Sequence, residues 1–74
     1  MSPKEHDLVR LKNLIPGVYI DTATTGTIIH LYQNNVACEV EFIIKGKSEI
    51  YTFRLDELIK VDYFIPELIF ESNF

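Results

Sequence analysis

The stretch TIIHLYQNNVACEVEF, residues 27–42, decides the fold. Its second half alternates strictly between apolar side chains and others, and the apolar set is Val36, Cys38, Val40 and Phe42. This period of two is expected of a strand with one buried and one wet face. Its first half is rich in β-branched and aromatic residues, which favour strands, and the Asn-Asn pair between the halves tolerates the positive φ of hairpin turns. We therefore predict a β-hairpin with strands at residues 27–32 and 36–42.

Three further short strands are predicted outside this hairpin, at residues 7–12, 48–55 and 59–61. A polar helical turn at residues 56–58, capped by Asp56, precedes the last strand. Residues 13–25 form a long loop, and all three glycines fall in predicted turns. The expected inward side chains outside the hairpin are Val9, Leu11, Tyr51, Phe53 and Leu55. Five short strands predict an all-β fold, a small five-stranded SH3-like barrel whose sheet curls closed.

The predicted barrel occupies residues 1–61 and leaves an acidic, aromatic extension at residues 62–74. All seven Lys and Arg residues precede this extension, whereas three of the eleven acidic residues lie within it. The extension could belong to the same domain or contact a partner, because its apolar groups need burial. Its expected partner-binding residues are Tyr63, Phe64, Ile65, Glu67, Leu68, Phe70, Glu71 and Phe74.

The composition indicates a small cytoplasmic protein. The chain has 74 residues and 47% hydrophobic content, enough for one domain with a small core. Its single cysteine excludes an internal disulfide and argues against a cysteine-based zinc site. The first residues contain no apolar run typical of a signal peptide, and no stretch approaches the length of a transmembrane helix. The net charge of −4 disfavours nucleic acid as a partner.

Three segments carry a resemblance to a known family: DLVRL (7–11), GTII (26–29) with Tyr32, and CEVEF (38–42). Together they resemble a family of small uncharacterised bacterial proteins whose SH3-like domain is similar to the β-subunit of nitrile hydratase and distantly to the KOW module. The resemblance spans about residues 7–61 and departs from the family pattern at residues 23–25. It implies the fold, no cofactor and no catalytic residues. It also suggests, by analogy, an operon partner with an antitoxin or immunity role.

No residue pattern indicates catalysis or a metal ion. His6 and His30 are the only histidines, and we expect surface or satisfied core roles for both. His30 shares a predicted strand face with Ile28 and Tyr32. Cys38 is expected to be buried and inert. We therefore predict that the chain is not an enzyme and binds no cofactor.

Three polar groups have alternative interpretations. Glu39 and Glu41 share one strand face, where we expect them to be solvated or paired with Arg10 or Lys12, or to dock a basic partner. The threonines of the long loop have no phosphate-binding spacing, so a contact surface is the functional alternative; they are Thr22, Thr24, Thr25 and Thr27. Three cations near two predicted inward rings give a weak RNA platform; the cations are Lys45, Lys47 and Arg54, and the rings Tyr51 and Phe53.

Three functions therefore stand as hypotheses. The favoured one is a non-enzymatic protein-interaction module that binds a protein partner or associates with itself as a homo-oligomer. By analogy with the family, this module would be an antitoxin, an immunity protein or an operon-partner binding protein. The first alternative is a KOW-like RNA-binding domain. The second is an accessory subunit of a larger enzyme, in which any catalysis belongs to the partner chain. None of the three involves a membrane.

Overall fold

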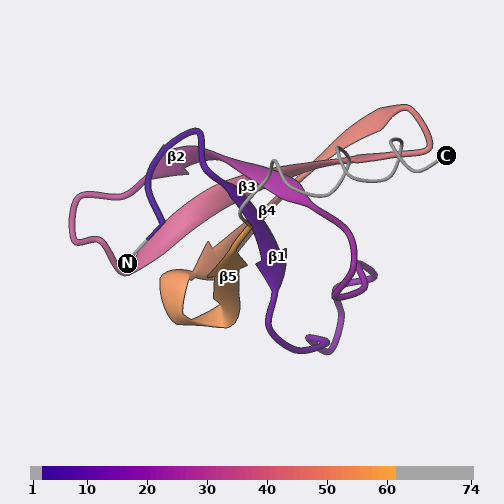
Figure 1. Ribbon diagram of the computed structural model, residues 1–74, viewed down its shortest axis with the longest axis horizontal. Coiled ribbons are helices and arrows are strands. Elements are labelled where there is room, and N and C mark those ends of the chain that lie inside the picture. The colour runs from indigo at the N-terminus through magenta and orange to yellow at the C-terminus, as the bar shows by residue number, and fades with distance from the viewer. Residues whose placement is uncertain (1–2, 62–74) are drawn as a thin grey trace, which may run out of the picture.

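The structure is a computed structural model that describes residues 3–61. This part of the chain is all-β, as predicted, and contains no helix long and apolar enough to cross a membrane. Its five antiparallel strands form one sheet in the order β4-β3-β2-β1-β5 (Figure 1). The elements are β1 (Leu8–Leu11), β2 (Gly26–Leu31), β3 (Ala37–Ile44), β4 (Lys47–Arg54), the 3-10 turn η1 (Leu55–Glu57) and β5 (Leu58–Lys60). The predicted bounds are correct to within two residues.

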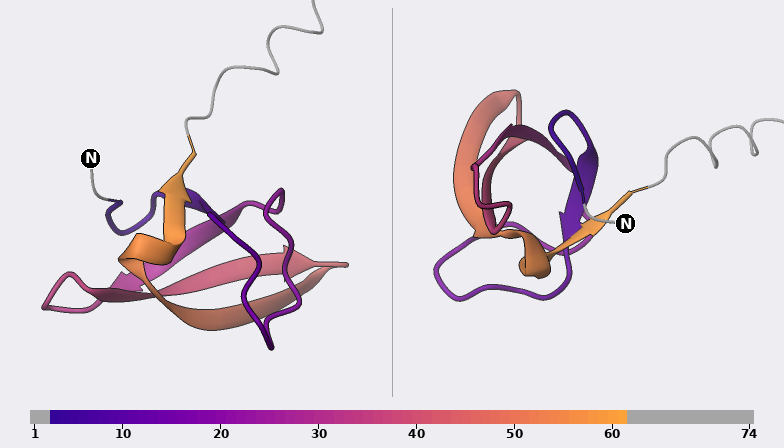
Figure 2. Two further views of the ribbon diagram at one scale, coloured as in Figure 1. Left: turned by 90° about the horizontal axis from the view of Figure 1, so that it is seen from below. Right: turned by 90° about the vertical axis from the view of Figure 1, so that its left-hand side faces the viewer.

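The sheet curls into a small barrel-like body but does not close (Figure 2). Its two outer strands are β4 and β5, which η1 connects in sequence and which form no ladder with each other among residues 3–61. The predicted closure is therefore wrong. The reason is local: β5 pairs with β1 through Val9↔Lys60 to Leu11↔Leu58, and its three residues offer few backbone groups for a second ladder with β4.

The core lies inside this curl and is centred on the Phe42 ring. Phe42 is fully buried and makes edge-to-face contacts with Tyr51 and Phe53, at centroid distances of 6.3 and 6.2 Å. Such aromatic pairs contribute beyond the area they bury. The buried core residues are Val9, Leu11, Ile20, Ile28, Cys38, Val40, Phe42, Phe53 and Leu58.

The predicted inward residues are nearly all found in or against this core. Tyr51 and Leu55 are half-buried and pack against it. Val36 is the exception, since its side chain is 46% exposed. It precedes the first residue of β3 and so lies at the end of the hairpin, beyond the reach of the core.

Gly26 is not in a turn, contrary to the prediction. It is the buried first residue of β2 and pairs with Val9 of β1. A Cβ placed there would lie 2.7 Å from both Val40 Cγ1 and Phe42 Cε1. Because these two side chains are fully buried, neither can move aside cheaply. Gly26 is therefore required for β2 to cross close over the centre of the core.

A register shift in β2 changes the face on which His30 lies. Ile28 pairs with Val40 whereas His30 pairs with Glu39, so Ile29 is an extra residue in β2. Such a bulge reverses the alternation of side chains beyond it. Ile28 is therefore buried while His30 is exposed, and the predicted face shared by the two does not exist.

The N-terminal segment covers the edge of β2 where β1 ends. The His6 N–H donates to the Ile28 carbonyl at 2.8 Å, and the Ile28 N–H donates to the Asp7 carbonyl at 3.0 Å. Farther along, the Glu5 carboxylate accepts the Leu31 N–H at 3.0 Å. The N-terminal segment therefore provides hydrogen-bond partners for the backbone groups of β2 that lie beyond the end of β1.

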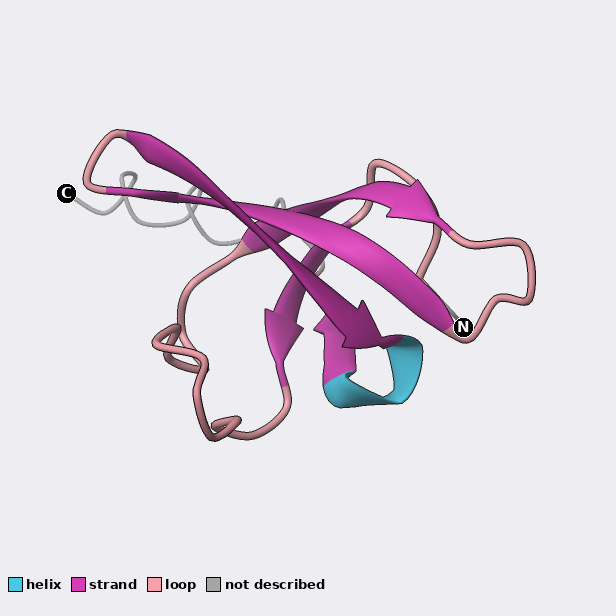
Figure 3. Ribbon diagram, turned by 180° about the vertical axis from the view of Figure 1, so that it is seen from behind, coloured by secondary structure: helices cyan, strands magenta, loops and turns pink. Residues whose placement is uncertain are grey.

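The helical turn η1, drawn in cyan in Figure 3, lies between β4 and β5. It begins at Leu55, one residue before the predicted start. Asp56 is not its cap. Its carboxylate instead binds the Arg54 guanidinium with two hydrogen bonds of 3.1 and 2.9 Å, which lower the pKa of Asp56. The Glu57 side chain reaches back and accepts the Arg54 backbone N–H at 2.9 Å.

We predict that Gly26→Ala lowers the free energy of unfolding by roughly 1–3 kcal/mol, the usual cost of overpacking a filled core. The added methyl group would overlap Val40 and Phe42. Urea denaturation measures the change. The matched control is Thr25→Ala, a truncation at the neighbouring exposed position. Equal stabilities for the two variants would contradict the close crossing.

We also predict that the Cys38 thiol is protected from modification in the native state. It is buried in the core, and this burial raises its pKa. Labelling by a thiol reagent then requires opening of the fold, which for a core worth ~3 kcal/mol slows the reaction by roughly a hundredfold. The comparison is with the chain in urea, and Thr52→Cys in a Cys38→Ala background is the exposed control. Equally fast labelling of Cys38 and the control would refute the prediction.

Candidate functional site

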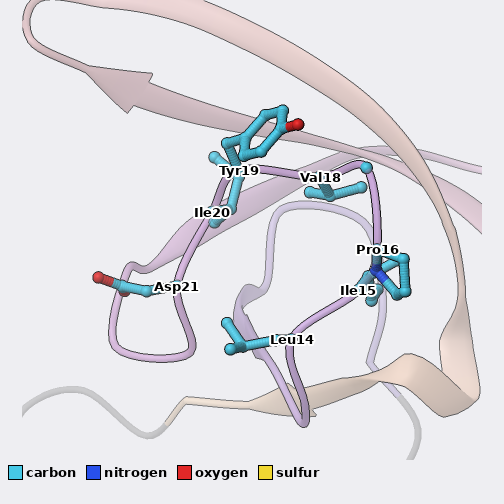
Figure 4. A pocket seen from close by; sticks show the side chains of 8 residues that line it. Leu14, Ile15, Pro16, Val18, Tyr19, Ile20 and Asp21 are labelled. Atoms are coloured by element: carbon cyan, nitrogen blue, oxygen red, sulfur yellow. The ribbon is translucent and has the colours of Figure 1, made fainter.

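The loop between β1 and β2 forms a pocket of about 590 Å³. We call it the loop pocket. It is lined by Leu14, Ile15, Pro16, Gly17, Val18, Tyr19, Ile20 and Asp21. Its volume falls in the range of pockets that hold drug-sized molecules or single large side chains. Figure 4 shows that all the labelled side chains belong to this one loop, which doubles back on itself around the pocket.

The floor of the loop pocket is fixed by the core. Ile20 is buried in the core, and Ile15 and Val18 are half-buried and pack against it. Between them, Pro16 and Gly17 form a tight turn, in which the Val18 N–H donates to the Ile15 carbonyl at 3.0 Å. Gly17 has φ of 86°, and proline followed by a positive-φ glycine is the pattern of a type II turn. Three anchors and one turn therefore hold this loop in place.

Its rim, by contrast, is apolar and exposed. Tyr19 is 92% exposed and Leu14 is 70% exposed. Neither side chain contributes to the core, so the fold does not account for their apolar character. A single exposed apolar residue is ordinary, but two on the rim of one pocket form a patch of the kind that binds partners.

Asp21 is the last residue in sequence that lines the loop pocket. Its carboxylate accepts hydrogen bonds from the Thr24 hydroxyl at 2.8 Å and the Ala23 N–H at 2.9 Å. The bond from Thr24 is the main reason that the pKa of Asp21 is lowered. This turn uses the acidic group locally, so Asp21 shapes the rim and is not a free acid.

A smaller pocket of about 280 Å³ adjoins the first and shares three residues with it. It is lined by Asn13, Leu14, Ile15, Pro16, Asp56 and Glu57. Its acidic side belongs to η1, where Asp56 binds Arg54 and Glu57 caps the Arg54 N–H. The two carboxylates therefore have partners within the chain. The bond that joins η1 to the start of the loop comes from the backbone, where the Lys12 N–H donates to the Glu57 carbonyl at 2.9 Å.

The histidines lie apart from the loop pocket. His30 is exposed beside the Glu5 carboxylate, at 3.8 Å, and contacts the Tyr32 ring edge-on at 4.6 Å between centroids. His6 is also exposed. Within residues 3–61 no three His, Cys, Asp or Glu side chains gather as a metal ion would require.

Glu39 and Glu41 lie on the outer face of β3, but their partners are not those predicted. Glu39 accepts hydrogen bonds from the Tyr32 hydroxyl and from Thr52 Oγ1, the latter at 3.0 Å. Glu41 accepts one from Ser48 Oγ at 2.5 Å. Arg10 and Lys12 are not adjacent, because β1 pairs with β2 and β5 and not with β3. The bond to Glu39 raises the pKa of Tyr32.

The threonine-rich segment divides in the structure. Thr22 and Thr25 are exposed, Thr24 donates to Asp21, and Thr27 belongs to β2. Of the threonine-rich segment and the turn that begins it, only Asp21 lines the loop pocket. The loop pocket therefore lies on the N-terminal side of the threonines, at residues 14–21.

The predicted RNA platform is not assembled. Lys45 and Lys47 lie at the turn between β3 and β4, whereas Arg54 is at the far end of β4, bound to Asp56. The Phe53 ring is buried and the Tyr51 ring half-buried, so neither offers a face for base stacking beside these cations.

The predicted partner-binding residues of the extension lie outside the residues that the structure describes. The structure instead draws attention to five residues that sequence reasoning passed over as plain loop: Leu14, Ile15, Val18, Tyr19 and Ile20. The available signal was their composition, since five of the seven residues at 14–20 are apolar or aromatic in a segment otherwise typical of a polar loop.

Comparisons with protein-family models, with curated proteins and with solved structures found no match.

Proposed function

We propose that this chain is a non-enzymatic protein-interaction module whose loop pocket binds an apolar side chain of a partner protein. The observation that carries the proposal is the exposed pair Leu14 and Tyr19 on the rim of a pocket anchored in the core. Tyrosine is one of the residue types that most often dominate the binding energy of protein interfaces.

The anchoring of the loop supports this function energetically. Binding surfaces lose affinity when loops must be ordered at the moment of association. Here Ile15, Val18 and Ile20 already pack against the core, and the turn at Pro16 fixes the path of the chain. A partner side chain entering the pocket would therefore find its walls largely preformed.

The placement of the reactive side chains supports a non-enzymatic role. The thiol of Cys38 is buried, and burial raises its pKa, which is the opposite of what a nucleophile needs. Glu39 and Glu41 accept hydrogen bonds from hydroxyl groups on the outer face of β3, away from the loop pocket. Neither group is placed to act on a molecule held in the pocket.

The class of partner comes from the resemblance alone. It suggests an operon partner, such as a toxin-like enzyme that the module neutralises. The chemistry of the pocket adds that the partner presents an exposed apolar or aromatic side chain at the contact.

We expect selected ligands to bind at the loop pocket and to depend on its rim. Peptides selected from a random library against the full chain would shift the backbone NMR signals of residues 14–21. Tyr19→Ala and Leu14→Ala should each weaken binding about tenfold or more, corresponding to ~1.4 kcal/mol. Because both side chains are exposed, unfolding free energy should change by less than about 0.5 kcal/mol.

The matched control is Ile43→Ala, which truncates an apolar side chain that is 61% exposed on β3, outside the pocket. This variant should bind as the unaltered chain does. The proposal fails if selected peptides shift signals elsewhere, or if the rim variants bind as tightly as the control.

A further inference from the structure

The outer edge of β4 is the longest unpaired strand edge in the described part of the chain. β4 (Lys47–Arg54) has eight residues, stands at one end of the sheet order and pairs only with β3. The opposite end of the sheet is the three-residue strand β5. The exposed edge of β2 is covered by the N-terminal segment, as described above. Long unpaired edges invite pairing with another strand.

The ladder between β3 and β4 determines which backbone groups face this edge. The last ladder pair is Ala37↔Arg54, so the next residues, Val36 and Leu55, also lie opposite each other. The Leu55 N–H donates to the Val36 carbonyl, which makes this pair a hydrogen-bonded one. In an antiparallel ladder, hydrogen-bonded positions alternate with positions whose groups point away. The odd-numbered positions of β4 therefore bond to β3, and the even-numbered positions direct their N–H and C=O groups outward.

Arg54 gives an independent check of this assignment. It is an even-numbered position, and its N–H is bonded by the Glu57 carboxylate rather than by β3. The remaining even-numbered positions are Ser48, Ile50 and Thr52. Among residues 3–61, no further backbone hydrogen bond reaches the outward N–H and C=O groups of these three residues. They form a row of three donors and three acceptors centred on Ile50.

The surroundings leave room for another strand. The far half of the β3–β4 hairpin extends beyond the other strands (Figures 1 and 3). Ile50 is 53% exposed on the outer face, and Ser48 and Thr52 are also exposed. An approaching strand would meet an apolar side chain flanked by two hydroxyl groups.

We propose that a second copy of this chain pairs here, β4 antiparallel to β4, about a twofold axis beside Ile50. In this register Ile50 faces Ile50 of the second copy, and Ser48 faces Thr52, so an apolar pair lies between two hydroxyl pairs. Each outward N–H and C=O group then finds its counterpart, because the row is symmetric about Ile50. The direct Ile50 pair is of the kind that stabilises antiparallel sheets, whereas the Ser48 and Thr52 hydroxyl groups keep their hydrogen bonds to Glu41 and Glu39 of the same copy.

The charges at the two ends of β4 favour this orientation. One end is the turn that carries Lys45 and Lys47, and the other carries Arg54, bound to Asp56, and leads into η1 with Asp56 and Glu57. One cation and two acids leave this second end with a net charge of −1, and antiparallel pairing sets the lysine end of each copy opposite it. Parallel pairing would set lysines against lysines and acids against acids, which is unfavourable.

This inference does not rest on the proposed function, since no residue of the loop pocket belongs to this edge. Sedimentation equilibrium on the full chain should show a mass that rises with concentration from 8.6 kDa to twice that value. Ile50→Lys places two cations at the twofold axis and should raise the dissociation constant of the dimer at least tenfold. Ile43→Lys is the control, because Ile43 is exposed on the same outer face but on β3.

A chain that stays monomeric at all concentrations, or an Ile50→Lys variant that dimerises like Ile43→Lys, would overturn the proposal. The second result would place the contact elsewhere, including in residues 62–74 or on the loop pocket. Circular dichroism verifies that both variants fold. Peptide binding to the loop pocket should be unchanged in Ile50→Lys, so failure of one proposal leaves the other distinguishable.

Disulfide trapping tests the register itself. Directly opposed, hydrogen-bonded residues on antiparallel strands have Cα atoms about 5.5 Å apart, which a disulfide can span. Ile50→Cys alone should give a linked dimer on mild oxidation. Ser48→Cys alone should not, whereas an equimolar mixture with Thr52→Cys should. The native Cys38 is buried and does not compete. Efficient self-linking of Ser48→Cys would contradict the predicted register.

Discussion

The close contact between Gly26 and the Phe42 ring is the constraint on which the rest of the fold depends. Phe42 fills the centre of the core and is braced edge-on by two further rings. β2 can cross over this ring only because Gly26 has no side chain there. The crossing brings β1 alongside β2 through the pair Val9↔Gly26, and β1 in turn holds β5. The absence of a Cβ at Gly26 thus allows the sheet to curl around its largest fully buried side chain.

The alternation from Cys38 to Phe42 could be predicted from sequence because it reflects a local rule, one face buried and one wet. The same rule failed one strand earlier. It assigned His30 to the face of Ile28, but the extra residue Ile29 reverses the alternation between them. A bulge leaves no periodic signal in so short a strand, and it is stabilised by tertiary contacts such as that of Glu5 with the Leu31 N–H. Gly26 was misassigned for a similar reason, since glycine indicates close backbone approach as well as turns.

The candidate site was harder to predict than the fold. The turn at Pro16 and Gly17 could be predicted from the sequence, because proline followed by glycine favours a specific local backbone turn. The sequence did not predict which of the neighbouring loop residues face the core. Tyr19 and Ile20 are adjacent and both apolar, yet one is exposed and the other buried. That difference depends on where the loop returns to the sheet, which is a property of the assembled core and not of the segment.

The rim of the loop pocket and the outer edge of β4 differ in how much they contribute to the stability of the domain. The rim of the loop pocket contributes nothing to the core, so its apolar side chains could become polar at little cost to stability. The β4 edge differs, because the other side of the same strand supplies Phe53 and Tyr51 to the core. A strand added at this edge would restrain β4, and with it the Tyr51 and Phe53 rings, and would also join two chains. Since any species that binds only the folded chain stabilises it, dimerisation through β4 would reinforce a core that chain length alone keeps small.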